Sequence, residues 1–328
     1  MKKLLSLVIP VFFGLISYGQ QYVKFQSYVQ IRLSSDFDSL YSGEMRRLKF
    51  YLRNGKNFYP NWAYFISAGV YQRSKERLII HDIRLCYQYK NLKIYTGQFI
   101  PAFSIQRSQS DWQMPVLERA RAVGYLQPNG TIGVRDLGIQ AEITSRKKQL
   151  KLRLGIFNGR GTKQWSLKNT NFLASANIQY QDSLYKLHYL IGTSYMFRKA
   201  QNLPLPEIIP DTMLFSGADR RYDIYAMVEY NGISLQSEFI HARLNDFSMQ
   251  GYYFLATARL KKFQSVISYE NFANAVYPCH NCKKLSIGIN YFADKNYFRI
   301  SNFINFDVDK KNFSGLQFIF QLQIFLIR

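Results

Sequence analysis

From residue 22 to the end of the chain, apolar and polar residues alternate with a period of two. Near the start, Val23, Phe25 and Val29 alternate with polar residues such as Lys24 and Gln26. Because successive side chains of a β-strand point to opposite faces, each such segment has one apolar and one polar face. No segment outside the N-terminus has a convincing helical pattern. Sixteen strands are predicted, at residues 22–33, 46–54, 61–71, 78–89, 91–99, 134–144, 149–157, 171–181, 184–197, 221–230, 232–243, 250–260, 263–272, 283–292, 296–306 and 315–327.

The connections between these strands alternate in length. Seven are short turns, built on pairs such as Asn54-Gly55 and Asn231-Gly232, and the other eight are mostly longer. The two longest connections cover residues 100–133 and 198–220. An even strand number with short turns on one side is typical of outer-membrane barrels. We therefore predict an all-β fold, a 16-stranded antiparallel transmembrane β-barrel with short periplasmic turns and longer extracellular loops. The alternative is a secreted β-sandwich, whose loops lack this rhythm.

The N-terminus has the pattern of a secretory signal peptide. Lys2 and Lys3 precede an apolar run over residues 4–16, and Ser17 and Gly19 provide small residues before a cleavage point at Gln20. An uncleaved membrane anchor is the alternative, although the run is short for a transmembrane helix. We expect residues 1–19 to be a signal peptide and residues 20–328 a single barrel domain in the Gram-negative outer membrane.

Composition narrows the class of protein and of partner. The 26 Phe and 25 Tyr among 328 residues exclude a disordered chain, and apolar runs of about 20 residues, which helical membrane proteins require, do not recur. The net charge of +22 favours an anionic partner. Since a secreted chain meets little nucleic acid, we expect small anions, and outer-membrane lipids with lipopolysaccharide, as partners.

Charged residues on the polar phase of the strands are distributed unevenly. A 16-stranded barrel encloses an aqueous channel, so the polar phase should face its lumen. In the last eight strands Arg259 and Arg299 are outnumbered by Asp223, Glu229, Glu238 and Glu270. In the first eight only Asp82 and Glu142 oppose nine predicted pore-lining basic residues, namely Lys24, Arg32, Arg47, Lys49, Arg53, Arg84, Lys93, Lys151 and Arg153. Such a basic wall favours anions; alternatively, the charges only keep the lumen hydrated.

The connection over residues 100–133 follows the fifth strand, where general porins fold a loop into the lumen. We expect it to form a constriction. Its charged residues include Asp111 and the four predicted constriction residues Arg107, Glu118, Arg119 and Arg121.

Several stretches within residues 22–161 resemble the phosphate-selective porin O and P family. They are Gly97-Gln98-Phe99-Ile100-Pro101-Ala102-Phe103, Glu118-Arg119, Arg135-Asp136-Leu137-Gly138, the stretch 154–161 and the basic strand 46–52. The resemblance implies a sixteen-stranded outer-membrane porin, with phosphate as a candidate solute and a homotrimer as the expected assembly. We predict an outer-membrane porin for passive uptake of small anionic solutes.

Other functional classes have less support. No GxSxG motif occurs, and His81 and His241 fall on the lipid-facing phase, so we expect no catalytic residues and no barrel enzyme such as a phospholipase. Cys279 and Cys282 lack a second ligand pair for zinc, so we expect no metal and no cofactor, and either a local disulfide or no role. An adhesive or structural barrel is the remaining alternative, but only two connections exceed 20 residues.

Overall fold

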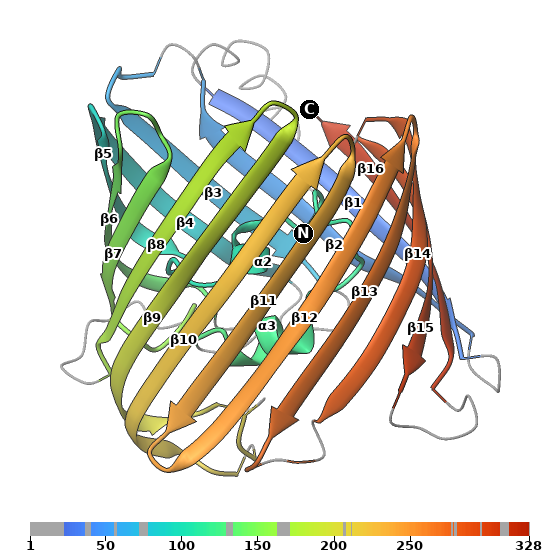
Figure 1. The fold of residues 1–328 in the computed structure, drawn as a ribbon. Coiled ribbons are helices and arrows are strands. Elements are labelled where there is room, and N and C mark those ends of the chain that lie inside the picture. Colours follow the sequence, from blue (N-terminus) through green and yellow to red (C-terminus); the bar gives the residue numbers. More distant parts are fainter. Residues whose placement is uncertain are drawn as a thin grey trace, which may run out of the picture.

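The chain forms a closed barrel of sixteen antiparallel strands, in which β1 pairs with β16 (Figure 1). The computed structural model describes residues 23–36, 41–55, 58–71, 78–128, 134–162, 171–205, 208–210, 212–276, 278, 281–295, 297–308 and 315–327. The predicted signal peptide lies outside this range. The strands are β1 (Val23–Ser35), β2 (Tyr41–Asn54), β3 (Trp62–Val70), β4 (Leu78–Tyr89), β5 (Leu92–Phe99), β6 (Asp136–Thr144), β7 (Leu150–Phe157), β8 (Leu173–Leu184), β9 (Leu187–Leu203), β10 (Phe215–Tyr230), β11 (Ile233–Leu244), β12 (Phe247–Leu260), β13 (Phe263–Asn274), β14 (Cys282–Asp294), β15 (Phe298–Asp307) and β16 (Gln317–Ile327).

All sixteen predicted strands are present, so the predicted fold class is confirmed, with three differences in the connections. β9 continues to Leu203 and β10 begins at Phe215, so the predicted loop at residues 198–220 is mostly strand. The connection after β11 is only residues 245–246. The 100–133 connection also contains two short helices that the sequence pattern did not predict, α2 (Ile105–Ser108) and α3 (Arg121–Leu126). Among the described residues, no helix is long and apolar enough to cross a membrane.

The barrel wall is apolar outside and largely polar inside. Outward side chains such as Ile139, Ile156 and Ile224 are 58–65% exposed, whereas the inward-facing Arg221 and Asp223 are fully buried. In water an outer surface of this kind would be costly, but in lipid it is favoured. Closure of the barrel also leaves each strand paired on both sides, as a hydrocarbon layer requires.

Two irregularities in strand pairing turn additional side chains toward the lumen. Ser67 pairs with Asp82 while the next residue, Ala68, pairs with Ile80, so His81 is an extra residue in β4. Such a bulge breaks the strict alternation of faces. His81 is therefore 7% exposed and its Nε2 lies 2.7 Å from the Tyr71 hydroxyl, so its predicted lipid-facing orientation is wrong. A second shift, between β1 and β2, similarly leaves Arg46 without a pairing partner.

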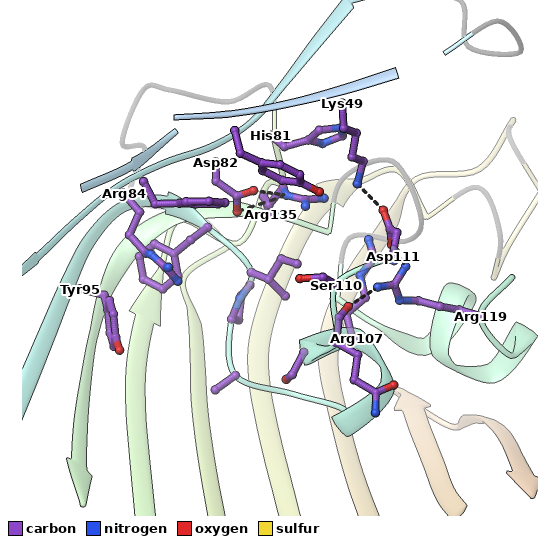
Figure 2. Close-up of a pocket in the computed structure, with 18 of the residues that line it drawn as sticks. Lys49, His81, Asp82, Arg84, Tyr95, Arg107, Ser110, Asp111, Arg119 and Arg135 are labelled. Carbon is purple, nitrogen blue, oxygen red and sulfur yellow. Dashed lines mark hydrogen bonds and ion pairs between the residues drawn. The ribbon is translucent and has the colours of Figure 1, made fainter. Parts of the chain in front are cut away.

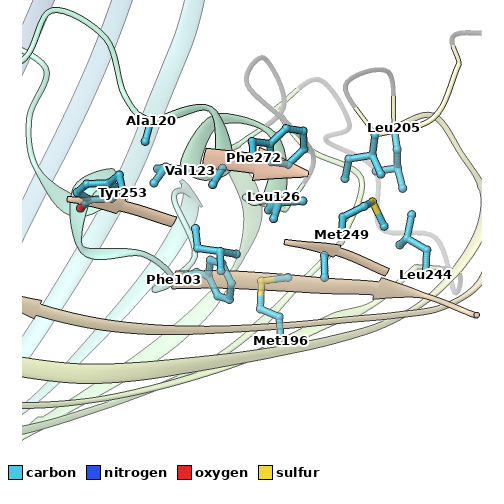
Figure 3. Packing of buried hydrophobic residues seen from close by; sticks show 14 of the residues in the cluster. Phe103, Ala120, Val123, Leu126, Met196, Leu205, Leu244, Met249, Tyr253 and Phe272 are labelled. Atoms are coloured by element: carbon cyan, nitrogen blue, oxygen red, sulfur yellow. The ribbon is translucent and has the colours of Figure 1, made fainter. Parts of the chain in front are cut away.

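Apolar side chains fill one side of the lumen (Figure 3). Phe103 and Val123, from the connection between β5 and β6, belong to a buried cluster with Met249 and Phe272 of the wall. The same cluster includes Leu205, from the connection between β9 and β10. α3 contacts β11, β12 and β13. The described part of the connection between β5 and β6, residues 100–128, is called the inner loop below. It folds into the barrel and packs against part of its wall (Figure 1).

Candidate functional site: a basic cavity beside the inner loop

Charged and amide side chains of β10–β16 hold the main chain of the inner loop. Carboxylates accept hydrogen bonds from its amides: Asp223 from Ser104 N (3.1 Å), Glu238 from Gln106 N (3.3 Å) and Glu270 from Arg121 N (2.8 Å). Donors of the same wall bind its carbonyl oxygens: Arg299 to Met114 (2.7 Å), Asn290 to Pro115 (2.8 Å), Gln323 to Trp112 (3.2 Å), and Arg221 to Leu126 (2.9 Å) and Gln127 (3.0 Å). The wall predicted to be the more acidic is therefore the anchor of the loop.

On the other side of the inner loop lies a cavity of about 1430 Å³, lined mainly by β2–β7 and the loop itself (Figure 2). This volume exceeds that of a typical small-molecule pocket. Twelve lysine or arginine side chains line the cavity against five carboxylates, an excess of seven positive charges. The uneven charge distribution predicted from the sequence therefore has a counterpart in a basic cavity.

Most of the predicted residues meet at this cavity. Its lining includes six of the nine predicted pore-lining residues and all four predicted constriction residues, namely Arg47, Lys49, Arg53, Arg84, Lys93, Arg153, Arg107, Glu118, Arg119 and Arg121. Lys24 and Lys151 lie near the turn ends of β1 and β7 and do not line it. Arg32 is buried and binds Gln321 (2.7 Å) and Glu118 (2.7 Å).

Asp111 of the inner loop neutralises part of the basic wall (Figure 2). Its carboxylate pairs with Arg47 (3.0 Å) and, at shorter distances, with Lys49 and Arg119. Burial alone would raise the pKa of Asp111, but the charges of Arg119, Lys49 and Arg47 hold that pKa well below its usual value. Arg47 and Lys49 are therefore not free charges facing a passing ion, as the sequence had suggested; they hold the loop.

Glu118 forms a second junction between the inner loop and the wall. It pairs with Arg32 (2.7 Å), Arg46 (2.8 Å) and Arg47 (3.6 Å). Burial raises the pKa of Glu118, but the charges of Arg47, Arg46 and Arg32 outweigh it and lower the pKa to about 2. This carboxylate remains ionised, and the junction intact, at neutral and mildly acidic pH.

Three arginines of the cavity have no carboxylate within 4.0 Å among the described residues: Arg53, Arg84 and Arg107. Arg107 projects from α2, and its Nε is buried with no hydrogen-bond partner within the described ranges. Burial and the positive charges of Arg119 and Arg135 lower the pKa of Arg107 well below its usual value. No carboxylate of the described residues neutralises these three guanidinium groups.

Four lining residues with basic side chains were missed by sequence reasoning. One of them, Lys284 of β14, pairs with Glu270 (2.7 Å). Arg46 and His81 reach the lumen only because of the bulges, which no local sequence signal marked. Arg135 lies just before β6 and pairs with Asp82 (3.3 Å). It belongs to the Arg135-Asp136-Leu137-Gly138 stretch that carried the family resemblance, which was the one signal that could have identified it.

No protein-family model and no curated protein sequence matches the chain. Solved structures do match in fold. OprB of Pseudomonas putida at high pH is 9% identical over 95% of each chain, with a TM-score of 0.66. OmpT, an outer membrane protein of Vibrio cholerae in its trimer form, is 9% identical over 92% of this chain and 98% of its own (TM-score 0.61). A mutant Rh. blastica porin is 7% identical over 93% and 100% (TM-score 0.59).

The chain is an integral outer-membrane β-barrel. Its closed antiparallel wall, apolar exterior and polar lumen are the properties of that class, and the three structures share its architecture.

Nothing in the described part of the chain groups three histidine, cysteine or acidic side chains around a metal site. Cys282 is a buried free thiol, and Cys279 lies outside the described residues. The absence of a metal, a cofactor and catalysis remains a prediction.

Proposed function

We propose that the protein is a passive outer-membrane channel for small anionic solutes. The observation that carries the proposal is the cavity beside the inner loop, with twelve cationic side chains against five carboxylates. Three of those cations, Arg53, Arg84 and Arg107, have no carboxylate partner among the described residues. A charged wall of low dielectric constant concentrates counter-ions in the space that it encloses. The cavity should therefore favour anions over cations of similar size.

The size of this effect can be bounded. The interaction energy between a unit charge and an ion 4 Å away is about 1 kcal/mol at the dielectric constant of bulk water and about 4 kcal/mol at that of a protein surface. Since 1.4 kcal/mol is tenfold in occupancy, one unpaired arginine already gives a several-fold bias. Salt should reduce this bias, because the Debye length falls from about 10 Å at 0.1 M to about 3 Å at 1 M.

The test is the zero-current potential of the reconstituted mature protein under a KCl gradient. We expect anion selectivity in the wild type and a shift toward cations when Arg53, Arg84 and Arg107 are together changed to Gln. Arg47 and Lys49 are unsuitable targets, because their loss would release Asp111 and the inner loop. Arg259→Gln is the matched control, since Arg259 is a strand arginine that does not line the cavity. Cation selectivity in the wild type would refute the proposal. An unchanged zero-current potential in the triple variant would refute it as well.

Phosphate is proposed as one of the transported anions, because the stretches that resemble the phosphate-selective porin family include Glu118 and Arg135, both of which line the cavity. Inorganic phosphate should reduce chloride current at lower concentration than sulfate does. Equal inhibition by phosphate and sulfate would contradict a preference for phosphate and would indicate a channel for anions in general.

A homotrimer is proposed for the assembly, with lipids and lipopolysaccharide around its outer surface. The support is the trimer form of the OmpT structure, which shares the barrel architecture. Chemical crosslinking of the protein in outer-membrane vesicles should give a ladder that ends at three chains. A ladder that ends at one or two chains would contradict the trimer.

A further inference from the structure

Part of the cavity wall consists of aromatic side chains, and Arg84 lies among them. The Arg84 guanidinium carbon is 5.4 Å from the centroid of the Phe65 ring and 5.1 Å from that of the Tyr95 ring. All three residues line the cavity, and each is only partly buried. Cation–π contact uses the face of a guanidinium group and leaves its edge N–H groups available to an oxyanion. No carboxylate among the described residues occupies that edge.

Neighbouring residues extend this arrangement. Arg53 of β2 and Arg84 of β4 are both register partners of Phe65 in β3, so two unpaired arginines flank one ring. The Tyr51 ring is stacked beside Phe65, with centroids 5.8 Å apart. Pro101 and Ala102 of the inner loop border the same cavity, and Ala102 N donates to Gln140 of β6 (3.0 Å). The result is a patch with apolar ring faces and two cationic groups.

We propose that this patch binds aromatic monocarboxylates, with the carboxylate on Arg84 and Arg53 and the flat ring against the aromatic side chains. Hydrated inorganic anions gain nothing from ring faces, whereas a benzoate-like ion satisfies both parts of the patch at once. Guanidinium–carboxylate pairs are frequently bidentate, which fixes the orientation of the ligand. Aromatic pairs stabilise further through offset or edge contacts. The inference rests on the proposed channel function and names a solute class for it.

The experiment measures block of chloride current through the reconstituted protein by benzoate, with cyclohexanecarboxylate and acetate as probes of equal charge. We expect benzoate to block at a concentration at least tenfold lower than acetate, and cyclohexanecarboxylate to lie between them. Arg84→Gln should raise the half-blocking concentration of benzoate at least tenfold, which corresponds to about 1.4 kcal/mol. Phe65→Leu should also raise it severalfold, a larger factor than the one by which it raises the half-blocking concentration of acetate.

Arg259→Gln is again the matched control, because Arg259 also lies over an aromatic ring, that of Phe292 (4.3 Å), but outside the cavity. Its benzoate block should equal that of the wild type. Equal block by benzoate and acetate in the wild type would overturn the inference, as would unchanged benzoate block in both Arg84→Gln and Phe65→Leu. The zero-current potential in KCl is recorded on the same membranes. It decides the channel proposal separately, since it involves no organic acid.

Discussion

The two sides of the lumen contain the same kinds of charged side chain and use them differently. On the packed side, Arg221, Arg299 and Glu238 are buried and bind the main chain of the inner loop. On the open side, Arg53 and Arg84 face a cavity and have no carboxylate partner in the part of the chain that the structure describes. Burial and the available partner decide whether an arginine binds the inner loop or leaves its charge facing the cavity; the residue type alone does not. Four predictions follow from this contrast, from the largest expected effect on stability to the smallest.

The strongest test of the packed side is Asp219→Ala. Asp219 is buried and binds Arg198 (2.5 Å) and Arg221 (2.8 Å), which are also buried. Removing the carboxylate leaves two buried cations without it and should lower the free energy of unfolding by about 3–5 kcal/mol. Urea unfolding in lipid vesicles measures this change. Asp246→Ala is the control, since Asp246 pairs with Arg243 at 3.7 Å on an exposed turn. Equal free energies of unfolding for Asp219→Ala and Asp246→Ala would contradict the structural role assigned to the buried charges of the packed side.

Asp111→Asn tests the border between the two sides. The substitution removes the carboxylate that Arg47, Lys49 and Arg119 share, so we expect a loss of about 1.5–3 kcal/mol in the free energy of unfolding. The cavity also loses a negative charge, so the zero-current potential should move further toward anions. Asp294→Asn, a change of the same type outside the cavity lining, provides the control. A shift toward cations would show that Asp111 does not act on the permeating ion in this way.

Acid should affect the junction between Glu118 and the wall. The pKa of Glu118 is lowered from 4.5 in the unfolded chain to about 2 in the folded one. Its contribution to stability is therefore complete above pH 4.5 and is lost as the pH falls through about 2. The difference in single-channel conductance between the wild type and Glu118→Gln should stay constant between pH 7 and 5 and change only toward pH 2. A change in this difference centred near pH 4.5 would contradict the prediction.

The smallest effect on stability is expected for Arg53→Gln on the open side. Arg53 is exposed to the cavity and has no carboxylate partner among the described residues, so the free energy of unfolding should change by no more than about 0.5 kcal/mol. The zero-current potential should nevertheless shift measurably toward cations. A stability loss as large as that of Asp219→Ala would remove the distinction between the two sides.

The strand order and the position of the cavity could be predicted because both follow from strict alternation. Each strand has a period of two, and closure of sixteen such strands places the polar phase inside. The basic residues of strands β2–β7, such as Arg47, Arg84 and Arg153, could therefore be assigned to one wall before their neighbours were known.

Local deviations and distant partners could not be predicted. His81 and Arg46 face the lumen because single extra residues shift the pairing, and this depends on the partner strand. The pairing of Asp111 with Arg47 and Lys49 depends on the path of a 36-residue connection between β5 and β6, to which alternation does not apply. For the same reason, the sequence located the basic wall but did not distinguish its free charges from its neutralised ones.

The anchoring of the inner loop has a consequence for how this protein can diverge or be redesigned. Wall side chains bind the amides of Ser104, Gln106 and Arg121 and several carbonyl oxygens, groups that nearly any amino acid provides. Substitutions at exposed loop positions such as Ser108 and Ser110, which line the cavity, leave those main-chain bonds in place. The path of the loop is thus encoded in the barrel, so that the loop side chains that line the cavity can change one residue at a time on a fixed scaffold.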